Sequence, residues 1–244
     1  MPIAIYPDLE TLSHDAAKYV VRVAQESIAA HERFTLALSG GNTPKKLYAL
    51  LASEPYRDQI DWTLVDVFWS DERNVSPDSS DCNYKLADEV LLNLVPIPAT
   101  QVHRIRGEQE DRDAASLAYE QEMRKVFKTN GVPHFDLIQL GMGPEGHTAS
   151  LFPHQPSLHE TQRLIMPVTV PKPPPPRLTF TPPLLNAARH ILFLVTGADK
   201  AEAVQEVIEG VRNPEEYPAQ IVNPEYGEVT WMFDTAAAAK LHSR

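Results

Sequence analysis

Apolar side chains recur along this chain with two different spacings. Residues 8–31 place them every three or four positions, which predicts an amphipathic helix, whereas residues 34–38 form a short apolar run typical of a buried strand. The same two patterns predict helices over 43–53, 81–92, 111–128, 198–209 and 234–241, and strands over 64–69, 101–105, 135–140, 191–195 and 229–233. Because helices and strands alternate, we expect an α/β fold with a mostly parallel central sheet covered on both faces.

Proline interrupts this pattern in one segment, Pro167–Pro183, which includes the run PKPPPPR. Four consecutive prolines favour an extended polyproline stretch over a helix or a sheet interior. Two interpretations stay open. The segment is either a stiff surface connection or a rigid rim that delivers Arg177 to a pocket.

The segment SGGNTP, residues 39–44, joins the strand over 34–38 to a helix. Thr43 suits the N-cap and Pro44 the first helical position, so the free backbone N–H groups of this helix start offer an anion site. The segment lacks the Gly-Lys-Ser/Thr ending of ATP-binding loops and the GxGxxG of dinucleotide-binding proteins, which disfavours ATP and NAD. An ordinary turn is the alternative. The candidate phosphate ligands are Ser39, Gly40, Gly41, Asn42 and Thr43.

A charged triplet, Asp71, Glu72 and Arg73, follows the strand over 64–69. Because parallel strands end at one edge of a sheet, this loop and the SGGNTP loop should lie near each other. Either one of the three side chains faces a ligand while its neighbours pair, or the loop is simply solvated.

A glycine-rich turn with one histidine follows the strand over 135–140. Glu145 lies two residues before His147, and a nearby carboxylate can fix the tautomer of an imidazole and stabilise its protonated form. His147 is therefore a candidate for proton transfer. Its spacing from His154 and His159 does not match a zinc site, so we expect no metal here.

The segment TGADK, residues 196–200, follows the strand over 191–195. Lys200 falls in the first turn of a helix, where a cation opposes the helix dipole unless it meets an anion. Together with Arg177 it could hold a phosphate from the side opposite the SGGNTP loop.

Composition narrows the classes of function. The net charge of −11 over 244 residues argues against general nucleic-acid binding. Cys82 is the sole cysteine, which excludes an internal disulfide and suits a reducing cytoplasm. We find no secretory signal pattern and no apolar run of about 18 residues that would span a membrane. We expect one domain over residues 1–244 in the cytoplasm, with no membrane partner.

In order and spacing, the motifs resemble the glucosamine-6-phosphate isomerase/6-phosphogluconolactonase family, and most closely its lactonases. They are SGGNTP (39–44), DER (71–73) with Asn83, GMGPEGHTASLFP (141–153), RLTFT (177–181), TGADK (196–200) and the terminal segment with Pro218-Ala219, Trp231 and Asp234. The resemblance implies a Rossmann-like three-layer fold, shared with glucosamine-6-phosphate deaminases and ribose-5-phosphate isomerases. It also implies hydrolysis of 6-phospho-D-glucono-1,5-lactone in the oxidative pentose phosphate pathway, without cofactor, by a monomer or small homo-oligomer.

The resemblance, together with the motifs, implies a role for each candidate residue. His147 is the general base, Glu145 orients it or holds a sugar hydroxyl, and Arg73 stabilises the oxyanion or contacts the phosphate or the sugar. Asp71 and Glu72 orient Arg73. The phosphate binds the N–H groups of Gly40, Gly41 and Asn42, the Thr43 hydroxyl, Arg177 and Lys200. Glu145 stands where the family pattern usually has Asp, and it reaches one methylene further.

Two other functions stay open at this point. In the related deaminases, the equivalent turn usually continues into Phe-Asn-Glu-Pro, whose carboxylate serves in ring opening, whereas residues 150–153 here are Ser-Leu-Phe-Pro. A non-catalytic sugar-phosphate sensor would need the phosphate ligands but no general base, and the intact turn around His147 speaks against it.

Overall fold

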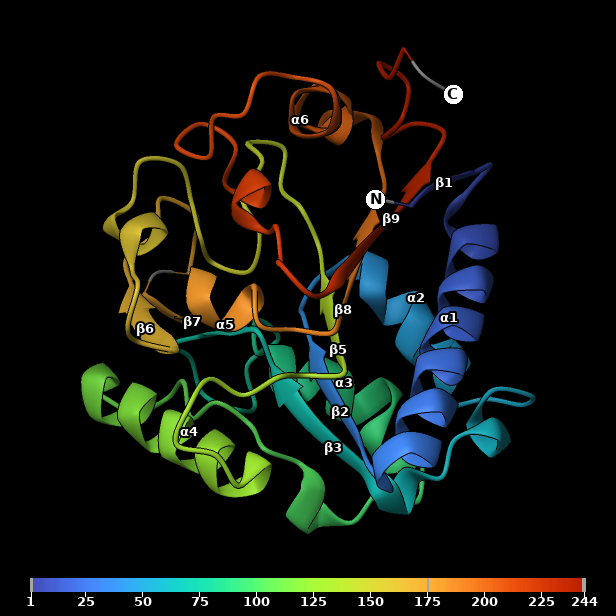
Figure 1. Cartoon of the computed structure of the whole chain (residues 1–244), viewed down its shortest axis with the longest axis vertical. Helices are drawn as coiled ribbons and strands as arrows, with labels where there is room; N and C mark the ends of the chain where they lie inside the picture. The colour runs from blue at the N-terminus through green and yellow to red at the C-terminus, as the bar shows by residue number, and fades with distance from the viewer. Residues whose placement is uncertain (1, 175, 243–244) are drawn as a thin grey trace.

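The computed structural model describes residues 2–174 and 176–242. Its centre is a six-stranded parallel sheet in the order β1-β9-β8-β5-β2-β3 (Figure 1). The strands are β1 (Ile3–Tyr6), β2 (Phe34–Leu38), β3 (Val65–Trp69), β5 (Leu137–Leu140), β8 (His190–Val195) and β9 (Glu228–Asp234). All five residues of β2 are buried, as a strand covered on both faces requires. The predicted α/β fold with a mostly parallel sheet is confirmed.

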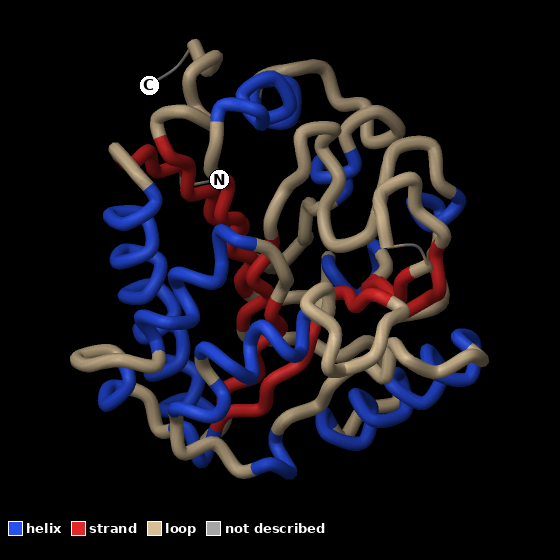
Figure 2. Tube along the Cα trace, turned by 180° about the vertical axis from the view of Figure 1, so that it is seen from behind, coloured by secondary structure: helices blue, strands red, loops and turns tan. Residues whose placement is uncertain are grey.

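Helices cover this sheet on its two faces. They are α1 (Leu9–His31), α2 (Asn42–Leu51), α3 (Asn83–Val90), α4 (Arg112–Phe127), α5 (Pro182–Leu185) and α6 (Ala201–Ile208). Seen from behind, α1 and α2 lie on one side of the sheet, while α4 lies on the other (Figure 2). Asp8 caps α1 by accepting a hydrogen bond from the Thr11 N–H at 2.8 Å, which explains why this helix starts at Leu9.

Short 3-10 helices complete many of the connections within the described residues. They are Arg57–Gln59, Trp62–Leu64, Leu92–Leu94, Ala99–Gln101, Pro156–His159, Ala198–Lys200 and Pro218–Ile221. The predicted strand over 101–105 is wrong, because this stretch begins at the end of a 3-10 turn and adds only an isolated bridge between Val102 and Val67.

A small antiparallel sheet, in the order β4-β7-β6, lies beside the main one and packs against α4. Its strands are β4 (Asp71–Arg73), β6 (Ile165–Val168) and β7 (Arg177–Phe180). The loop predicted over residues 71–73 and the polyproline stretch predicted over 167–183 both need correction. The ends of the proline-rich segment belong to β6, to β7 and to α5, and Pro167 lies in an edge strand, where a missing N–H is tolerated. Pro175, inside the same segment, falls outside the described residues.

Two further differences concern the ends of the chain. β1 is an edge strand of four residues that the apolar pattern did not predict. The alanine-rich helix predicted over 234–241 is a series of turns. The Asp234 carboxylate accepts hydrogen bonds from the N–H groups of Gly197 and Ala237, so it ties this segment to the loop after β8.

The topology gathers the candidate residues at one edge of the sheet. The chain runs from β2 outward to β3, and later returns to β5 on the other side of β2. Ligands of open α/β sheets bind where such a reversal leaves a crevice beyond the carboxyl ends of the strands. The loops after β2, β5 and β8 open into this crevice.

Candidate active site

A cavity of about 470 Å³ occupies the crevice beyond the carboxyl ends of the strands. Every predicted site residue except Glu72 and Glu145 lines it: Ser39, Gly40, Gly41, Asn42, Thr43, Asp71, Arg73, His147, Arg177 and Lys200. The structure therefore brings together residues that the sequence separates by as many as 161 positions, from Ser39 to Lys200. Glu145 instead lies against the imidazole of His147.

His147 is held in the wall of the cavity by its own turn. Its carbonyl accepts a hydrogen bond from the Gly143 N–H at 2.9 Å, and its ring stacks on Phe152 with 4.1 Å between centroids. Nδ1 lies 3.1 Å from Glu145 Oε1. The contact with His147 lowers the pKa of Glu145 to about 2, so this carboxylate is ionised at neutral pH. With Nδ1 facing Glu145, Nε2 is the nitrogen left for chemistry.

Glycines give this turn its shape. Gly146 has φ of +75°, a left-handed conformation that glycine adopts readily. Gly143 has a different task, because a Cβ at this position would lie 2.0 Å from His147 Nδ1 and 2.7 Å from Glu145 Oε2. The imidazole and the carboxylate occupy the space that a side chain would fill.

The SGGNTP loop starts α2 one residue earlier than predicted. The N-cap is Gly41, with φ of +109°, and no side chain caps the helix, so Thr43 is not the N-cap. The N–H groups of this first turn are therefore available to an anion. The Thr43 hydroxyl lies 2.8 Å from that of Thr196 and links the loop to the TGADK segment. Ser39 reaches the cavity, but its hydroxyl donates to Gln139 Oε1 at 2.6 Å.

The three side chains of the triplet after β3 have different hydrogen-bond partners. Asp71 accepts from Ser150 Oγ at 2.7 Å and from Asn83 Nδ2 at 3.1 Å, and Glu72 accepts from the backbone of α3. The Arg73 guanidinium donates to the carbonyl oxygen of Asp81 at 2.6 Å. The expectation that the carboxylates of Asp71 and Glu72 orient this guanidinium by pairing with it directly is therefore wrong.

Arg177 is buried beside His147. Its guanidinium lies over the ring of Phe152 at 5.7 Å and donates to the carbonyl oxygens of Lys172 at 3.1 Å and Pro174 at 3.3 Å. Burial lowers its pKa, with the nearby Asp71 acting in the opposite direction. Arg177 thus lines the cavity and also holds the proline-rich loop against it.

That loop carries a residue that the sequence analysis did not single out. Lys172 lines the cavity from the rim, together with Pro173 and Pro174. Lys200 lines it from the other loop and forms an ion pair with Asp199. The signal for Lys172 was present in the sequence, because it directly precedes the prolines that lead to Arg177. The other lining residues to which the sequence assigned no site role are Pro44, Asp81, Gly141, Met142, Gly143, Ala149, Leu194, Val195 and Thr196.

No group of three or more His, Cys, Asp or Glu side chains within residues 2–174 and 176–242 is placed to hold a metal ion. Across the same ranges, no helix has the length and apolar character needed to cross a membrane. The cavity offers instead an imidazole backed by a carboxylate, an uncapped helix start and the cations Arg73, Lys172, Arg177 and Lys200.

Comparisons with known proteins agree with the family that the motifs indicate. The family model described as glucosamine-6-phosphate isomerases/6-phosphogluconolactonase matches residues 7–231. A Synechocystis protein named 6-phosphogluconolactonase is 43% identical over 218 residues, which cover 88% of each chain. A protein of Oryza sativa subsp. indica named probable 6-phosphogluconolactonase 3, chloroplastic, is 39% identical over 99% of this chain and 76% of its own.

A solved structure extends the agreement to three dimensions. The 6-phosphogluconolactonase from Trypanosoma cruzi superposes with a TM-score of 0.87 at 27% identity, and covers 99% of this chain and 97% of its own. The family predicted from the motifs is confirmed. The chain belongs to the glucosamine-6-phosphate isomerase/6-phosphogluconolactonase family of enzymes.

Proposed function

We propose that this protein is a 6-phosphogluconolactonase, which hydrolyses 6-phospho-D-glucono-1,5-lactone to 6-phospho-D-gluconate in the oxidative pentose phosphate pathway. One observation carries the proposal. The imidazole of His147, backed by the ionised Glu145, faces the same cavity as the uncapped start of α2. A base and an anion site in one cavity suit a substrate with a phosphate at one end and an ester at the other.

The phosphate end of the substrate lies at the first turn of α2. Backbone N–H groups of Gly41, Asn42 and Thr43 meet its oxygens, helped by the positive end of the helix dipole. Lys200, whose ammonium pairs with Asp199 in the free protein, adds a charge-assisted contact. In a protein with a net charge of −11, these local donors are what attracts an anion.

The lactone end lies at His147. Nε2 takes a proton from a water molecule, whose oxygen attacks C1 of the lactone. The resulting oxyanion is stabilised by a guanidinium, for which Arg73 is the candidate. The bond between C1 and the ring oxygen then breaks, and the imidazolium returns its proton to that oxygen. Glu145 holds the ring in place, and general-base catalysis of this kind contributes about 10²–10⁴ in rate.

The test is a comparison of His147→Ala with His14→Ala. Both histidines lie near a glutamate, since His14 Nε2 is 3.3 Å from Glu10 Oε1, but His14 is on α1 and does not line the cavity. We expect His147→Ala to lower kcat at least about tenfold with little change in KM, and His14→Ala to leave both constants unchanged. Loss of the lactone is followed by NMR or proton release, corrected for spontaneous hydrolysis.

The same assay decides between the family's activities. Wild-type turnover in His147→Ala would remove this residue as the base. Release of ammonia from glucosamine 6-phosphate by the wild-type protein would favour a deaminase-like enzyme. Phosphate-ester binding with no turnover of either compound would indicate a sensor.

Several expectations about the setting accompany this proposal as predictions. They are a single domain over residues 1–244, a cytoplasmic location, a monomer or small homo-oligomer, and no nucleic-acid partner. The chloroplast in the rice relative's name belongs to that relative. Cell fractionation and light scattering of the purified protein test the location and the assembly.

A further inference from the structure

Glu72 is a charged side chain that has no role in the proposed mechanism of lactone hydrolysis. It belongs to β4 and is only 2% exposed. Its Oε1 accepts hydrogen bonds from the N–H groups of Arg73 and Asn83, both at 2.8 Å, and its Oε2 accepts one from the Tyr84 N–H at 2.8 Å. The Cys82 thiol donates to the same oxygen at 3.4 Å. Every one of these partners is a donor.

This arrangement requires a carboxylate. A protonated acid or an amide at position 72 would place a hydrogen opposite backbone N–H groups, which can only donate. Burial raises the pKa of Glu72 to about 7, although the backbone N–H groups of Asn83, Tyr84 and Arg73 act against that rise, so the carboxylate that these donors favour predominates above about pH 7. The negative charge also lies at the positive end of α3, where it is favoured. The side chain therefore fixes the first turn of α3 by charge as well as by shape.

The first turn of α3 and the two residues before it are connected to the cavity at three points. Asn83 Nδ2 donates to the carbonyl oxygen of Asp71 at 2.9 Å and to its carboxylate at 3.1 Å. The carbonyl of Asp81 receives the guanidinium of Arg73. Asn83 also packs so closely on Gly40 that a Cβ there would lie 1.8 Å from Asn83 Oδ1. A shift of this turn would move Arg73 and the SGGNTP loop together.

We infer that Glu72 is a positioning residue of the active site, which acts through the first turn of α3 to hold Arg73 and Gly40 in place for the substrate. This inference rests on the proposed function for its kinetic consequences. It replaces the expected direct pairing of Glu72 with Arg73 by an indirect route, through the backbone at the start of α3.

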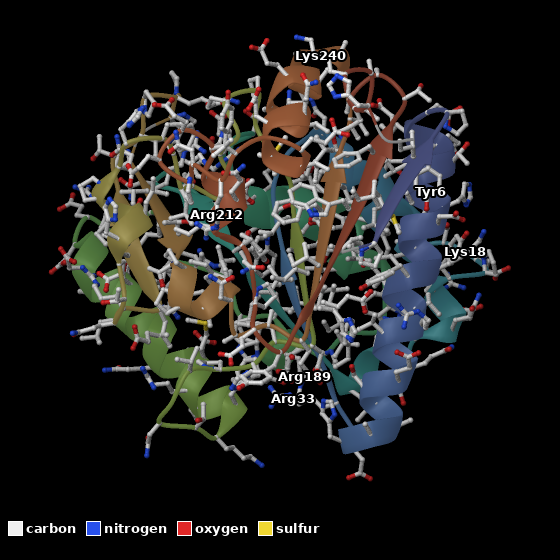
Figure 3. The ribbon with its side chains drawn as sticks, turned by 45° about the horizontal axis from the view of Figure 1, so that its top comes forward. Tyr6, Lys18, Arg33, Arg189, Arg212 and Lys240 are labelled. Atoms are coloured by element: carbon white, nitrogen blue, oxygen red, sulfur yellow. The ribbon has the colours of Figure 1, made fainter. Side chains whose placement is uncertain are left out.

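The chain offers a matched control in Asp136. This carboxylate is also 2% exposed and accepts from a backbone N–H, that of Thr35 at 2.9 Å. It pairs with Arg189, which is labelled in Figure 3 at the opposite end of the view from Lys240. Asp136 precedes β5, so it serves the amino edge of the sheet, and the cavity lies at the carboxyl edge.

Glu72→Gln and Asp136→Asn each replace a buried carboxylate by an amide of the same shape. We expect both variants to unfold at lower temperature than the wild type. Only Glu72→Gln should lower kcat/KM for the lactone, by at least about tenfold, because misplacing binding groups by about 1 Å costs up to about 10²-fold. Glu72→Asp, which keeps the charge, should recover part of that loss. Equal kcat/KM in folded Glu72→Gln and wild type, or an equal loss in Asp136→Asn, would overturn the inference.

A second variant tests the inference if Glu72→Gln does not fold. A second measurement tests it if the wild-type protein does not hydrolyse the lactone. If Glu72→Gln does not fold, Asn83→Ala removes the link to Asp71 and Gly40 while leaving Glu72 in place, and it should show the same loss; wild-type kinetics in Asn83→Ala would refute the chain of contacts. If the wild-type protein does not hydrolyse the lactone, the proposed function fails by itself. Amide hydrogen exchange at Asn83 and Gly40 then decides, because Glu72→Gln should accelerate exchange at both sites and Asp136→Asn at neither.

Discussion

Replacing Gly143 by alanine should disable the active site without removing any chemical group from it. The added Cβ would lie 2.0 Å from His147 Nδ1 and 2.1 Å from Cε1, whereas real Cβ contacts essentially never fall below 3.0 Å. The imidazole must therefore move by about 1 Å. The backbone itself can accept alanine, because the left-handed glycines of the described residues are Gly41, Gly146 and Gly197.

The size of the effect follows from that displacement. A misplacement of about 1 Å at a reacting group costs up to about 10²-fold in rate, which corresponds to about 2.7 kcal/mol of transition-state stabilisation. The same Cβ would lie 2.7 Å from Glu145 Oε2, so the ring cannot simply retreat toward its partner. We expect kcat for the lactone to fall about 100-fold and KM to change little, because the anion site at α2 is untouched.

Gly131→Ala is the matched control for this substitution. Its Cβ would lie 3.5 Å from Thr129 Oγ1, an ordinary contact, and the residue is not among those that line the cavity. Initial rates and thermal unfolding of both variants would be measured beside the wild type. A folded Gly143→Ala protein with wild-type kcat would refute the argument, since it would show that the position of the His147 ring does not limit the reaction.

Two further predictions concern charges. Lys172→Ala should raise KM for the phosphorylated lactone several-fold and leave kcat nearly unchanged, whereas Lys18→Ala on α1 should change neither; an unchanged KM would remove Lys172 from the substrate site. Burial lowers the pKa of His103, but its ring N–H groups donate to the carboxylates of Asp66 at 2.8 Å and Glu122 at 2.7 Å, and these hydrogen bonds outweigh burial, so the pKa is raised. The stability that this provides is complete below the pKa of an unfolded histidine, about 6.5, and is lost as pH rises through the higher folded value, by about 1.4 kcal/mol per unit of pKa difference. Urea unfolding at intervals from pH 6 to 9 should show this loss in the wild type and not in His103→Gln, and identical pH profiles would contradict it.

The apolar pattern predicted the main sheet well because its strands are buried on both faces. The predicted strand over 34–38 is β2 at the same residues, and the prediction over 64–69 misses β3 by one residue. Such strands can be recognised from the local sequence, because they form unbroken runs of apolar residues. Their carboxyl ends could also be assigned to one edge of the sheet, because parallel strands leave no other arrangement.

The small sheet could not be predicted in the same way. Asp71 and Glu72 lie in β4 with less than 6% exposure, and they are tolerated there because distant groups satisfy them. Ser150 donates to Asp71, and the backbone of α3 donates to Glu72. These hydrogen-bond partners are distant in the sequence, so the residues next to Asp71 and Glu72 do not reveal them. A buried strand with charged residues is therefore predicted as a solvated loop.

The candidate site, like the fold, could be predicted from the sequence only in part. The residue types and the strand-end positions of the loops identified the cavity before its shape was known. The geometry within the cavity could not be predicted from the sequence. The N-cap of α2 is Gly41 and not the predicted Thr43, and the guanidinium of Arg73 donates to a carbonyl oxygen and not to a carboxylate. Which atom meets which depends on tertiary contacts. The motifs identify the residues of the site but not the contacts that their atoms make.

The edge strand β1 has a consequence for the order in which the molecule is completed. It pairs with β9, Ile3 opposite Trp231, although all of the other helices and strands of the described residues lie between them in the chain. At a synthesis rate of about 5–20 residues per second, β1 waits about 10–50 s on the ribosome before its partner exists. α1 and the strands β2, β3 and β5 can assemble in that interval, while the unpaired β1 is only four residues long and offers little template for wrong pairing. The arrival of β9 then closes the sheet, so the amino-terminal strand is among the last parts of the nascent chain to find its place.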